Sequence, residues 1–166
     1  MKKNKGFSLV ELIIVIAIMA ILAAAIAPAL IRYIDKSRRA DDVTAAGSIN
    51  SAMSAALANE SAYDEVMSVA DGTILLYAAA GASGWTAAVT APTLTKEMDS
   101  SQAPPKLKYK KTVDSSATDG TKRGSSSFTP GGWAIAISGG KPIVYVTDST
   151  YANGVMLQPS INDEYK

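Results

Sequence analysis

The longest apolar run in the chain lies close to its N-terminus. Residues 12–31 contain no charged side chain, and the lysines Lys2, Lys3 and Lys5 precede them. At 1.5 Å per residue, this run makes a helix about 30 Å long, which matches the hydrocarbon core of a bilayer. The run therefore predicts a membrane-spanning helix, and the leading lysines favour a cytoplasmic N-terminus.

Further along the chain, the spacing of apolar residues places them on one face of a helix. Apolar side chains recur there mostly every three or four residues, at Val43, Ala46, Ile49, Met53 and Leu57. This spacing is typical of a helix with one buried face, and Asn59 is a suitable stop signal. The pattern predicts that one helix continues to residue 58 and that its second half carries a globular head.

Shorter patterns fill the remainder of the chain. The expected elements are a helix over 61–70 capped by Ser61, a strand over 73–79, a loop over 91–105, a strand over 107–113 and a strand over 155–157. The clearest signal is a hairpin of residues 133–137 and 143–146, because Gly139 and Gly140 suit a tight turn with positive φ. These elements predict an α+β fold. A long N-terminal helix with an apolar first half carries a small C-terminal antiparallel sheet of three or four strands on its distal half.

One carboxylate stands at the start of the apolar run. Glu11 precedes Leu12 directly, and a carboxylate in a membrane-spanning segment is costly unless it has a partner. Ser8 and Glu11 also have the spacing of a capping box, in which both side chains bond to amides at a helix start. The residues alone leave both interpretations open.

Three kinds of N-terminus contain such an apolar run. A secretory signal peptide has a shorter apolar core followed by a cleavage site, and a simple membrane anchor explains neither Gly6 and Phe7 nor Glu11. In the third kind, cleavage precedes the apolar run. Residues 5–11, Lys-Gly-Phe-Ser-Leu-Val-Glu, resemble the N-terminal signature of type IV pilins.

The resemblance implies roles for four residues. A prepilin peptidase would cut between Gly6 and Phe7, and Phe7 would become the methylated first residue of the mature chain. Glu11 would face the N-terminal ammonium of a neighbouring subunit and set the register between them. Pro28 lies where the family places its helix proline, which kinks or locally melts the helix. The implied parts are a leader at 1–6, a long helix at 7–58 and a head at 59–166.

The resemblance also implies a function and partners. The expected protein is the major subunit of a type IV pilus, a cell-surface filament that serves adhesion, motility or DNA uptake. Its partners would be other copies of itself, the cytoplasmic membrane before assembly, the prepilin peptidase and an assembly machinery with a motor ATPase. The alternatives are a pseudopilin of a type II secretion system, a minor or competence pilin, and a membrane-anchored binding domain that does not assemble.

Composition narrows the remaining functions. The 166 residues carry a net charge of +1, and removing the leader lysines leaves 13 basic against 15 acidic side chains, which argues against nucleic-acid binding by bulk charge. The chain has no cysteine and no histidine, which removes thiol and imidazole catalysis and the commonest zinc ligands. No residue set resembles an active site, so we expect neither enzymatic activity nor a cofactor or metal.

Three groups in the head have competing interpretations. The lysines at 106, 108, 110 and 111 could bind an anionic surface, but a solvated face of an edge strand is the better explanation. Residues 114–124 are rich in oxygen ligands, but a serine-rich loop explains them better than a calcium site. The aromatic residues Trp85, Trp133, Tyr145 and Tyr151 could form an adhesive face, although Trp133 fits the core better. Tyr165 and Lys166 are expected to be exposed.

Overall fold

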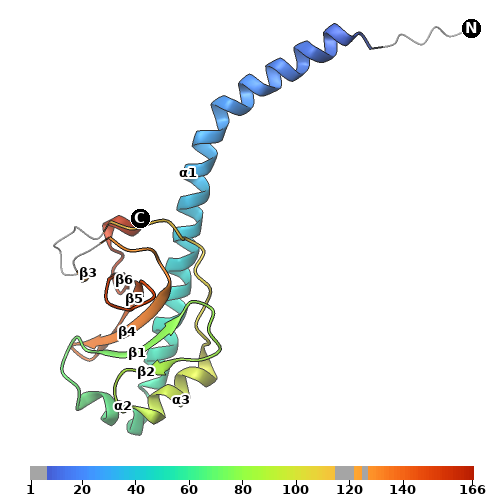
Figure 1. The fold of residues 1–166 in the computed structure, drawn as a ribbon. Helices are drawn as coiled ribbons and strands as arrows, with labels where there is room; N and C mark the ends of the chain where they lie inside the picture. The colour runs from blue at the N-terminus through green and yellow to red at the C-terminus, as the bar shows by residue number, and fades with distance from the viewer. Residues whose placement is uncertain (1–6, 115–121, 125–126) are drawn as a thin grey trace, which may run out of the picture. The chain divides into compact units, whose positions relative to one another are not determined.

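The computed structural model describes residues 7–114, 122–124 and 127–166 (Figure 1). The leader at 1–6 lies outside the described residues, as does most of the candidate calcium loop, including Ser115, Ser116, Asp119 and Gly120. The chain forms two compact units, Met1–Ser37 and Arg38–Lys166.

A single helix, α1, runs from Leu9 to Ala56 and contributes to both units. In the first unit its large apolar side chains are exposed, and the helix continues through Pro28. In the second unit one face is buried, at Asp42, Ala46, Ile49, Met53 and Ala56. The change from an all-round apolar surface to one buried face matches the sequence pattern.

The second unit contains one six-stranded sheet, and every neighbouring pair of strands in it is antiparallel. Its spatial order is β2-β1-β4-β5-β6-β3. The strands are β1 (Ile74–Ala79), β2 (Thr86–Ala87), β3 (Lys122–Arg123), β4 (Gly132–Ser138), β5 (Lys141–Thr147) and β6 (Gly154–Gln158). The α+β prediction is therefore confirmed. The sheet has more strands than expected because β2 and β3, at its edges, are too short to produce a sequence pattern.

One core joins α1 to the sheet. Ile49 and Met53 of α1 belong to the same buried cluster as Trp133 and Ile135 of β4. Trp133 is fully buried, and its indole nitrogen donates a hydrogen bond to the Pro105 carbonyl oxygen at 2.8 Å. The core assignment of Trp133 is thus confirmed, and the sheet packs on the distal part of α1 as predicted.

The predicted hairpin is formed by β4 and β5. Ser138 pairs with Lys141, and the two residues between them, Gly139 and Gly140, have φ values of 56° and 75°. Positive φ at both central positions is what a type I′ turn requires, and glycine adopts it without a steric penalty. The Asp71 carboxylate accepts hydrogen bonds from the Ser138 hydroxyl and the Gly139 amide, which holds the turn in place.

The two short helices of the head differ from the predictions. The helix α2 covers Glu60–Met67, and Asn59 caps it by accepting a hydrogen bond from the Ser61 amide, so the assignment of Ser61 as cap was wrong. The predicted loop at 91–105 contains the helix α3, Pro92–Ser101. Pro92 opens this helix, because proline at a first helical position loses no hydrogen bond. The Glu65 carboxylate of α2 accepts hydrogen bonds from the first amides of α3, at Thr93 and Leu94.

The predicted strand at 107–113 is not a strand. Its side chains alternate as expected, with Leu107, Tyr109 and Val113 buried and the lysines exposed, but its only β contact among the described residues is a single bridge from Val113 to Phe128. Two backbone amides of this segment bond to the Asp42 carboxylate instead of to a partner strand. The carboxylate accepts hydrogen bonds from the amides of Lys108 at 2.7 Å and Tyr109 at 3.0 Å.

Asp42 also binds the C-terminal residues of the chain. Its carboxylate accepts a hydrogen bond of 2.6 Å from the Tyr165 hydroxyl, in the short 3₁₀ helix η1 at Asp163–Tyr165. Tyr165 is only 1% exposed, so the prediction that it faces solvent was wrong, whereas Lys166 is exposed as expected. Burial raises the pKa of the Tyr165 hydroxyl, and the nearby Asp42 carboxylate raises it further. Tyr165 therefore remains a neutral donor to Asp42.

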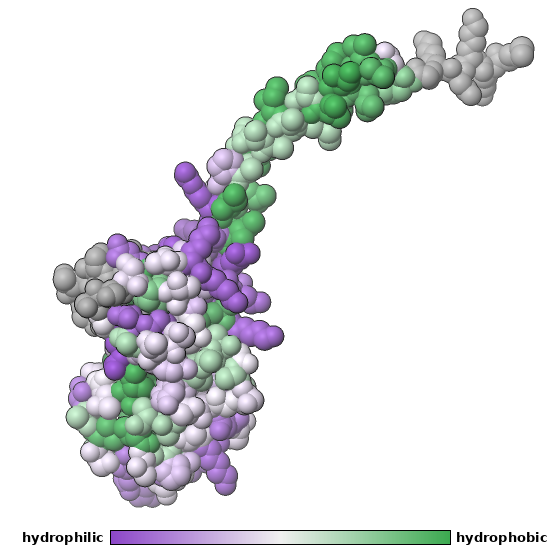
Figure 2. Space-filling view, in the orientation of Figure 1, coloured by the Kyte–Doolittle hydropathy of each residue, from purple (hydrophilic) through white to green (hydrophobic). Residues whose placement is uncertain are grey.

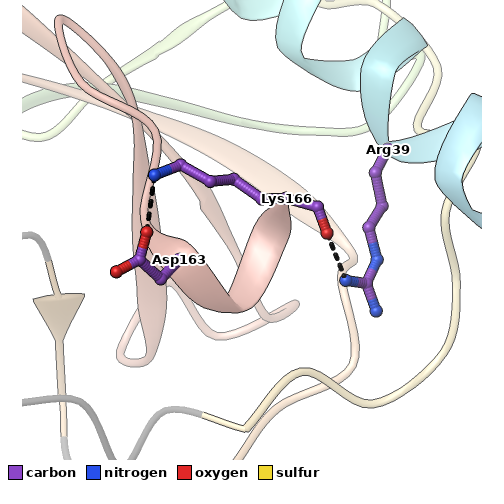
Figure 3. A network of polar contacts seen from close by, with 3 residues as sticks. All are labelled: Arg39, Asp163 and Lys166. Atoms are coloured by element: carbon purple, nitrogen blue, oxygen red, sulfur yellow. Dashed lines mark hydrogen bonds and ion pairs between the residues drawn. The ribbon is translucent and has the colours of Figure 1, made fainter.

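Arg39 reinforces this attachment from the preceding turn of α1. Its guanidinium donates to the Lys166 carbonyl oxygen at 3.1 Å, and Lys166 pairs with Asp163 (Figure 3). The same guanidinium lies 4.4 Å from the centre of the Tyr109 ring and donates to the Tyr109 hydroxyl. Tyr109 in turn meets Tyr165 edge to face at 5.7 Å. One turn of α1 thus holds both the segment around residue 108 and the C-terminal residues.

We expect Asp42→Ala to lower the free energy of unfolding of the second unit by about 3–5 kcal/mol, because it leaves two amides and a hydroxyl without their buried acceptor. Asp41→Ala is the matched control, since Asp41 is the exposed neighbour on the same helix. Its effect should stay within about 0.5 kcal/mol. Denaturant unfolding of the full chain in detergent, followed by tryptophan fluorescence, reports on this unit because both tryptophans lie in it. Equal stability of the two variants would contradict the role of Asp42.

Candidate functional site

The start of α1 is held by a capping box. The Glu11 carboxylate accepts a hydrogen bond of 2.9 Å from the Ser8 amide, and the Ser8 hydroxyl accepts one of 3.3 Å from the Val10 amide. These contacts satisfy two amides that a helix start otherwise leaves without partners. The local interpretation of the Ser8 and Glu11 spacing is therefore correct within the chain.

The hydrogen bond of the capping box leaves further acceptor positions on the Glu11 carboxylate. A carboxylate has about four acceptor positions, and one backbone amide occupies only one of them. The positive end of the helix dipole also stabilises negative charge in this first turn. Glu11 can therefore bind a further cation or donor, such as an ammonium group, without giving up the contact to Ser8.

An apolar surface follows Glu11 along the first unit. Its large apolar side chains are 41–76% exposed, from Phe7 at 76% to Ile34 at 41%. On the face drawn in Figure 2, green apolar residues cover most of this part of the helix. By length and composition, α1 can cross a membrane, with a mean hydropathy of 3.0 in its most apolar window. Such a surface is stable in a bilayer or among other apolar helices, but not in water.

The predicted site residues occupy different places in this unit. Phe7 lies two residues before α1 and Glu11 in its first turn, whereas Pro28 lies inside the helix. Gly6, on the other side of the predicted cleavage point, lies outside the described residues. Cleavage after Gly6, methylation of Phe7, the register role of Glu11 and the kinking or melting of the helix at Pro28 stay predictions.

Comparison with known protein families gives a match over residues 1–27. These residues match the model of the prokaryotic N-terminal methylation motif. The chain carries the type IV prepilin signature. The signature ends before the second unit begins, so it describes the apolar segment and not the head. No solved structure matches the chain.

This signature implies processing by a prepilin peptidase, and together with the apolar helix it is consistent with membrane insertion of a precursor. It suggests a structural protein. Within the described residues, no group of three or more acidic side chains could hold a metal ion. Of the candidate calcium loop, Asp114 is described, and it accepts a hydrogen bond from Ser127. The lysines of 106–111 are exposed, as predicted.

The aromatic residues proposed for an adhesive face separate into two groups. Trp85 is 5% exposed and donates its indole hydrogen to the Gln102 carbonyl oxygen, so it belongs to the core with Trp133. Tyr145 and Tyr151 lie in part at the surface. Burial raises the pKa of both hydroxyls; the Arg123 charge lowers that of Tyr145 in part, and the neighbouring Tyr77 adds to the rise at Tyr151.

Two members of this surface group, Tyr77 and Arg123, were not predicted from the sequence. The rings of Tyr77 and Tyr151 lie 4.5 Å apart at an interplanar angle of 45°. The Arg123 side chain donates from Nε to the Tyr151 carbonyl oxygen at 3.3 Å. Strand order brings these residues together from β1, β3 and the loop after β5. No local pattern in the sequence indicates this proximity.

Proposed function

We propose that the chain is the major subunit of a type IV pilus. The observation that carries this proposal is the exposed apolar surface of α1, which has the Glu11 carboxylate near its start and lies largely within the prepilin signature at residues 1–27. The precursor would wait in the cytoplasmic membrane with residues 12–31 in the bilayer. The assembled subunits would form an extracellular filament in which these helices bury one another.

In this proposal, maturation creates the partner of Glu11. Cutting between Gly6 and Phe7 would remove the leader at 1–6 and leave a methylated ammonium on Phe7. This ammonium would pair with Glu11 of a neighbouring subunit. Each charge is costly alone in an apolar bundle, whereas a pair with additional hydrogen bonds recovers much of the cost. Misregistered subunits would leave both charges without partners, so the pair would fix the axial register.

The remaining helix and head would have separate tasks. The helix at 7–58 would form first the membrane anchor and then the filament core, with Pro28 as the point where it kinks or locally melts. The head at 59–166 would present its sheet on the filament surface, for adhesion, motility or DNA uptake. Moving the helix from bilayer to bundle exchanges one apolar environment for another, so an external motor ATPase would set the direction of assembly.

Other members of the same class share this N-terminus. A pseudopilin of a type II secretion system would form a short envelope-bound fibre, and a minor or competence pilin would be scarce in filaments. From a different class, a membrane-anchored binding domain that does not assemble would keep its leader uncut. Electron microscopy and intact mass of protein sheared from the cell surface separate these candidates. Abundant thin fibres made of a chain that starts at Phe7 with one added methyl group favour the major pilin.

Glu11→Gln separates the register role from the capping role. Glutamine still completes a capping box but carries no charge, so the helix start should be retained while pairing with the ammonium is lost. We expect normal cleavage and at least about a tenfold loss of sheared filaments, because losing even about 1.4 kcal/mol per contact weakens each subunit association about tenfold. Glu11→Ala, which removes both interactions, should behave in the same way.

Ser8→Ala is the matched control for the Glu11 variants. It removes the hydroxyl that accepts from Val10 but keeps the carboxylate, at a cost of about 1 kcal/mol in helix capping. Filament yield, scored by electron microscopy and by immunoblotting of sheared protein, should stay close to that of the unaltered chain. If Ser8→Ala and Glu11→Gln reduce filaments equally, or if Glu11→Gln makes normal fibres, the register argument is wrong.

Substitutions at Gly6 test the cleavage point. Gly6→Ala adds one methyl group and should be processed normally or slightly slowly. Gly6→Leu should block processing, because the bulky side chain stands directly beside the bond to be cut. Intact mass of the membrane fraction measures the outcome, with the uncut chain starting at Met1 and the mature chain at Phe7. Normal maturation of Gly6→Leu would show that cleavage occurs elsewhere.

A further inference from the structure

The sheet face opposite the core is built around small residues. Trp133, Ile135 and Ile137 of β4 belong to the core cluster, so the alternate residues Gly132, Ala134 and Ala136 face the other way. Ala134 nevertheless has no exposed area. Its direct neighbours on the adjacent strands are Tyr77 and Tyr145. The large side chains of Tyr77 and Tyr145 thus flank and cover the small Ala134 on the central strand β4.

Tyr151 extends this aromatic group from the loop between β5 and β6. A side chain on Gly132 would meet the Tyr151 ring at 2.7 Å, so the ring lies directly over this glycine. Together with the contact to Tyr77, this position places two tyrosine rings side by side on the outer face. Glycine at 132 is what permits the close approach.

The loop holds Tyr151 in an uncommon conformation. Tyr151 has a φ of 59°, which is rare for a bulky residue and persists only where the surroundings enforce it. The Asp148 carboxylate provides this enforcement by accepting four hydrogen bonds, from the amides of Thr150 and Ala152 and the side chains of Thr150 and Asn153. These bonds lower the pKa of Asp148, although its partial burial acts in the opposite direction. A loop fixed in this way presents a pre-positioned ring.

A broad depression of about 610 Å³, largely open to solvent, lies beside the two rings. Its lining residues are of three kinds: the aromatic Tyr77 and Tyr151 with the basic Arg123, the hydroxyl-bearing Thr73, Ser149 and Thr150, and the apolar Ile74, Ala88 and Ala152. Arg123 reaches it from β3, where it pairs with Gly154. A guanidinium has five donor hydrogens, and the bond from Arg123 Nε to the Tyr151 carbonyl oxygen uses one of them.

Each group of this lining suits one part of a sugar acid. Flat aromatic rings pack against the C–H face of a pyranose and give apolar contact with fixed geometry. A guanidinium binds a carboxylate through two parallel hydrogen bonds, and hydroxyl side chains pair with sugar hydroxyls. A nucleic acid would require several cations along a backbone path, whereas Arg123 is the one basic residue among the described lining residues.

We propose that this outer face of the sheet binds a uronic-acid-containing polysaccharide, with Tyr77 and Tyr151 packed on the sugar ring and Arg123 paired with its carboxylate. The inference goes beyond the filament function and does not require it. It concerns the second unit alone and applies to the uncut chain as well as to a filament.

The test uses the purified full chain in detergent and calorimetric titration with tetragalacturonate and with a glucuronate-containing tetrasaccharide. We expect saturable binding of at least one of them and at least tenfold weaker binding of its carboxyl methyl ester, because the ester cannot form the charged pair. Arg123→Gln and Tyr77→Ala should each weaken binding about tenfold or more, since each removes one of the two recognition elements.

Two control variants match these substitutions elsewhere in the second unit. Lys141→Gln removes an exposed positive charge beside the β4–β5 turn, and Tyr63→Ala removes a tyrosine that is 43% exposed on α2. Both should keep the affinity of the unaltered chain within about twofold. Tryptophan fluorescence of every variant confirms folding, and Tyr77→Phe, which keeps the ring, should keep most of the affinity.

Several outcomes would overturn the proposal. They are no binding of either uronate probe, equal binding of the methyl ester, equal loss in Lys141→Gln and Arg123→Gln, or preferred binding of single-stranded DNA through the same residues. Because the titration uses unassembled chain, its failure leaves the filament proposal intact. A failure to form filaments likewise leaves the sugar site intact.

Discussion

A buried carboxylate holds the second unit together. Asp42 has no exposed area, and it accepts hydrogen bonds from two backbone amides and one hydroxyl. These donors come from positions 66, 67 and 123 residues away in the sequence. A charge in this position costs several kcal/mol when unpaired but is stable with a full set of donors. The attachment of the 108–109 segment and of the C-terminal residues to α1 depends on it.

Asp42 also marks the point where the surface of α1 changes. On the N-terminal side, α1 presents apolar side chains all round, and this surface cannot remain in water. From Arg38 onward the helix has a single buried face, and Asp42 is the first residue of that face. The polar contacts of Arg39 and Asp42 mark the start of the globular part. The first part of α1 therefore presents a surface that suits lipid or other helices, whereas its distal part contributes one buried face to the core of the second unit.

The sequence predicted the elements whose signals are local. The α1 helix, β1, the β4–β5 hairpin and β6 each follow from periodicity or turn residues within about ten positions. The errors arose where distant residues decide the structure. The segment around Tyr109 has a strand pattern but bonds to Asp42, and Tyr165 is buried although it stands at the end of the chain. Pro92 indicated a loop, yet the Glu65 carboxylate helps to start a helix there.

For the candidate sites, the same distinction holds between local and distant signals. The prepilin signature is a contiguous motif, so its residues could be predicted from the sequence alone. The face formed by Tyr77, Tyr151 and Arg123 depends on strand order and on a loop conformation set by Asp148, which no contiguous pattern encodes. Tyr151 could be singled out as a surface aromatic residue, but Arg123 had no signal that linked it to Tyr151.

The two carboxylates of α1 that stand beside apolar surface show how the division of tasks arises. Asp42 is buried and obtains three donors within the chain, so its carboxylate serves the folding of the second unit. Glu11 bonds to the Ser8 amide, at a point where the apolar surface of the helix must be covered by lipid or by other helices. Covering that surface removes water from Glu11 and makes a second partner far more valuable. A fold that satisfies one carboxylate internally and leaves capacity on the other therefore separates the stability of the head from the assembly that we propose for the helix.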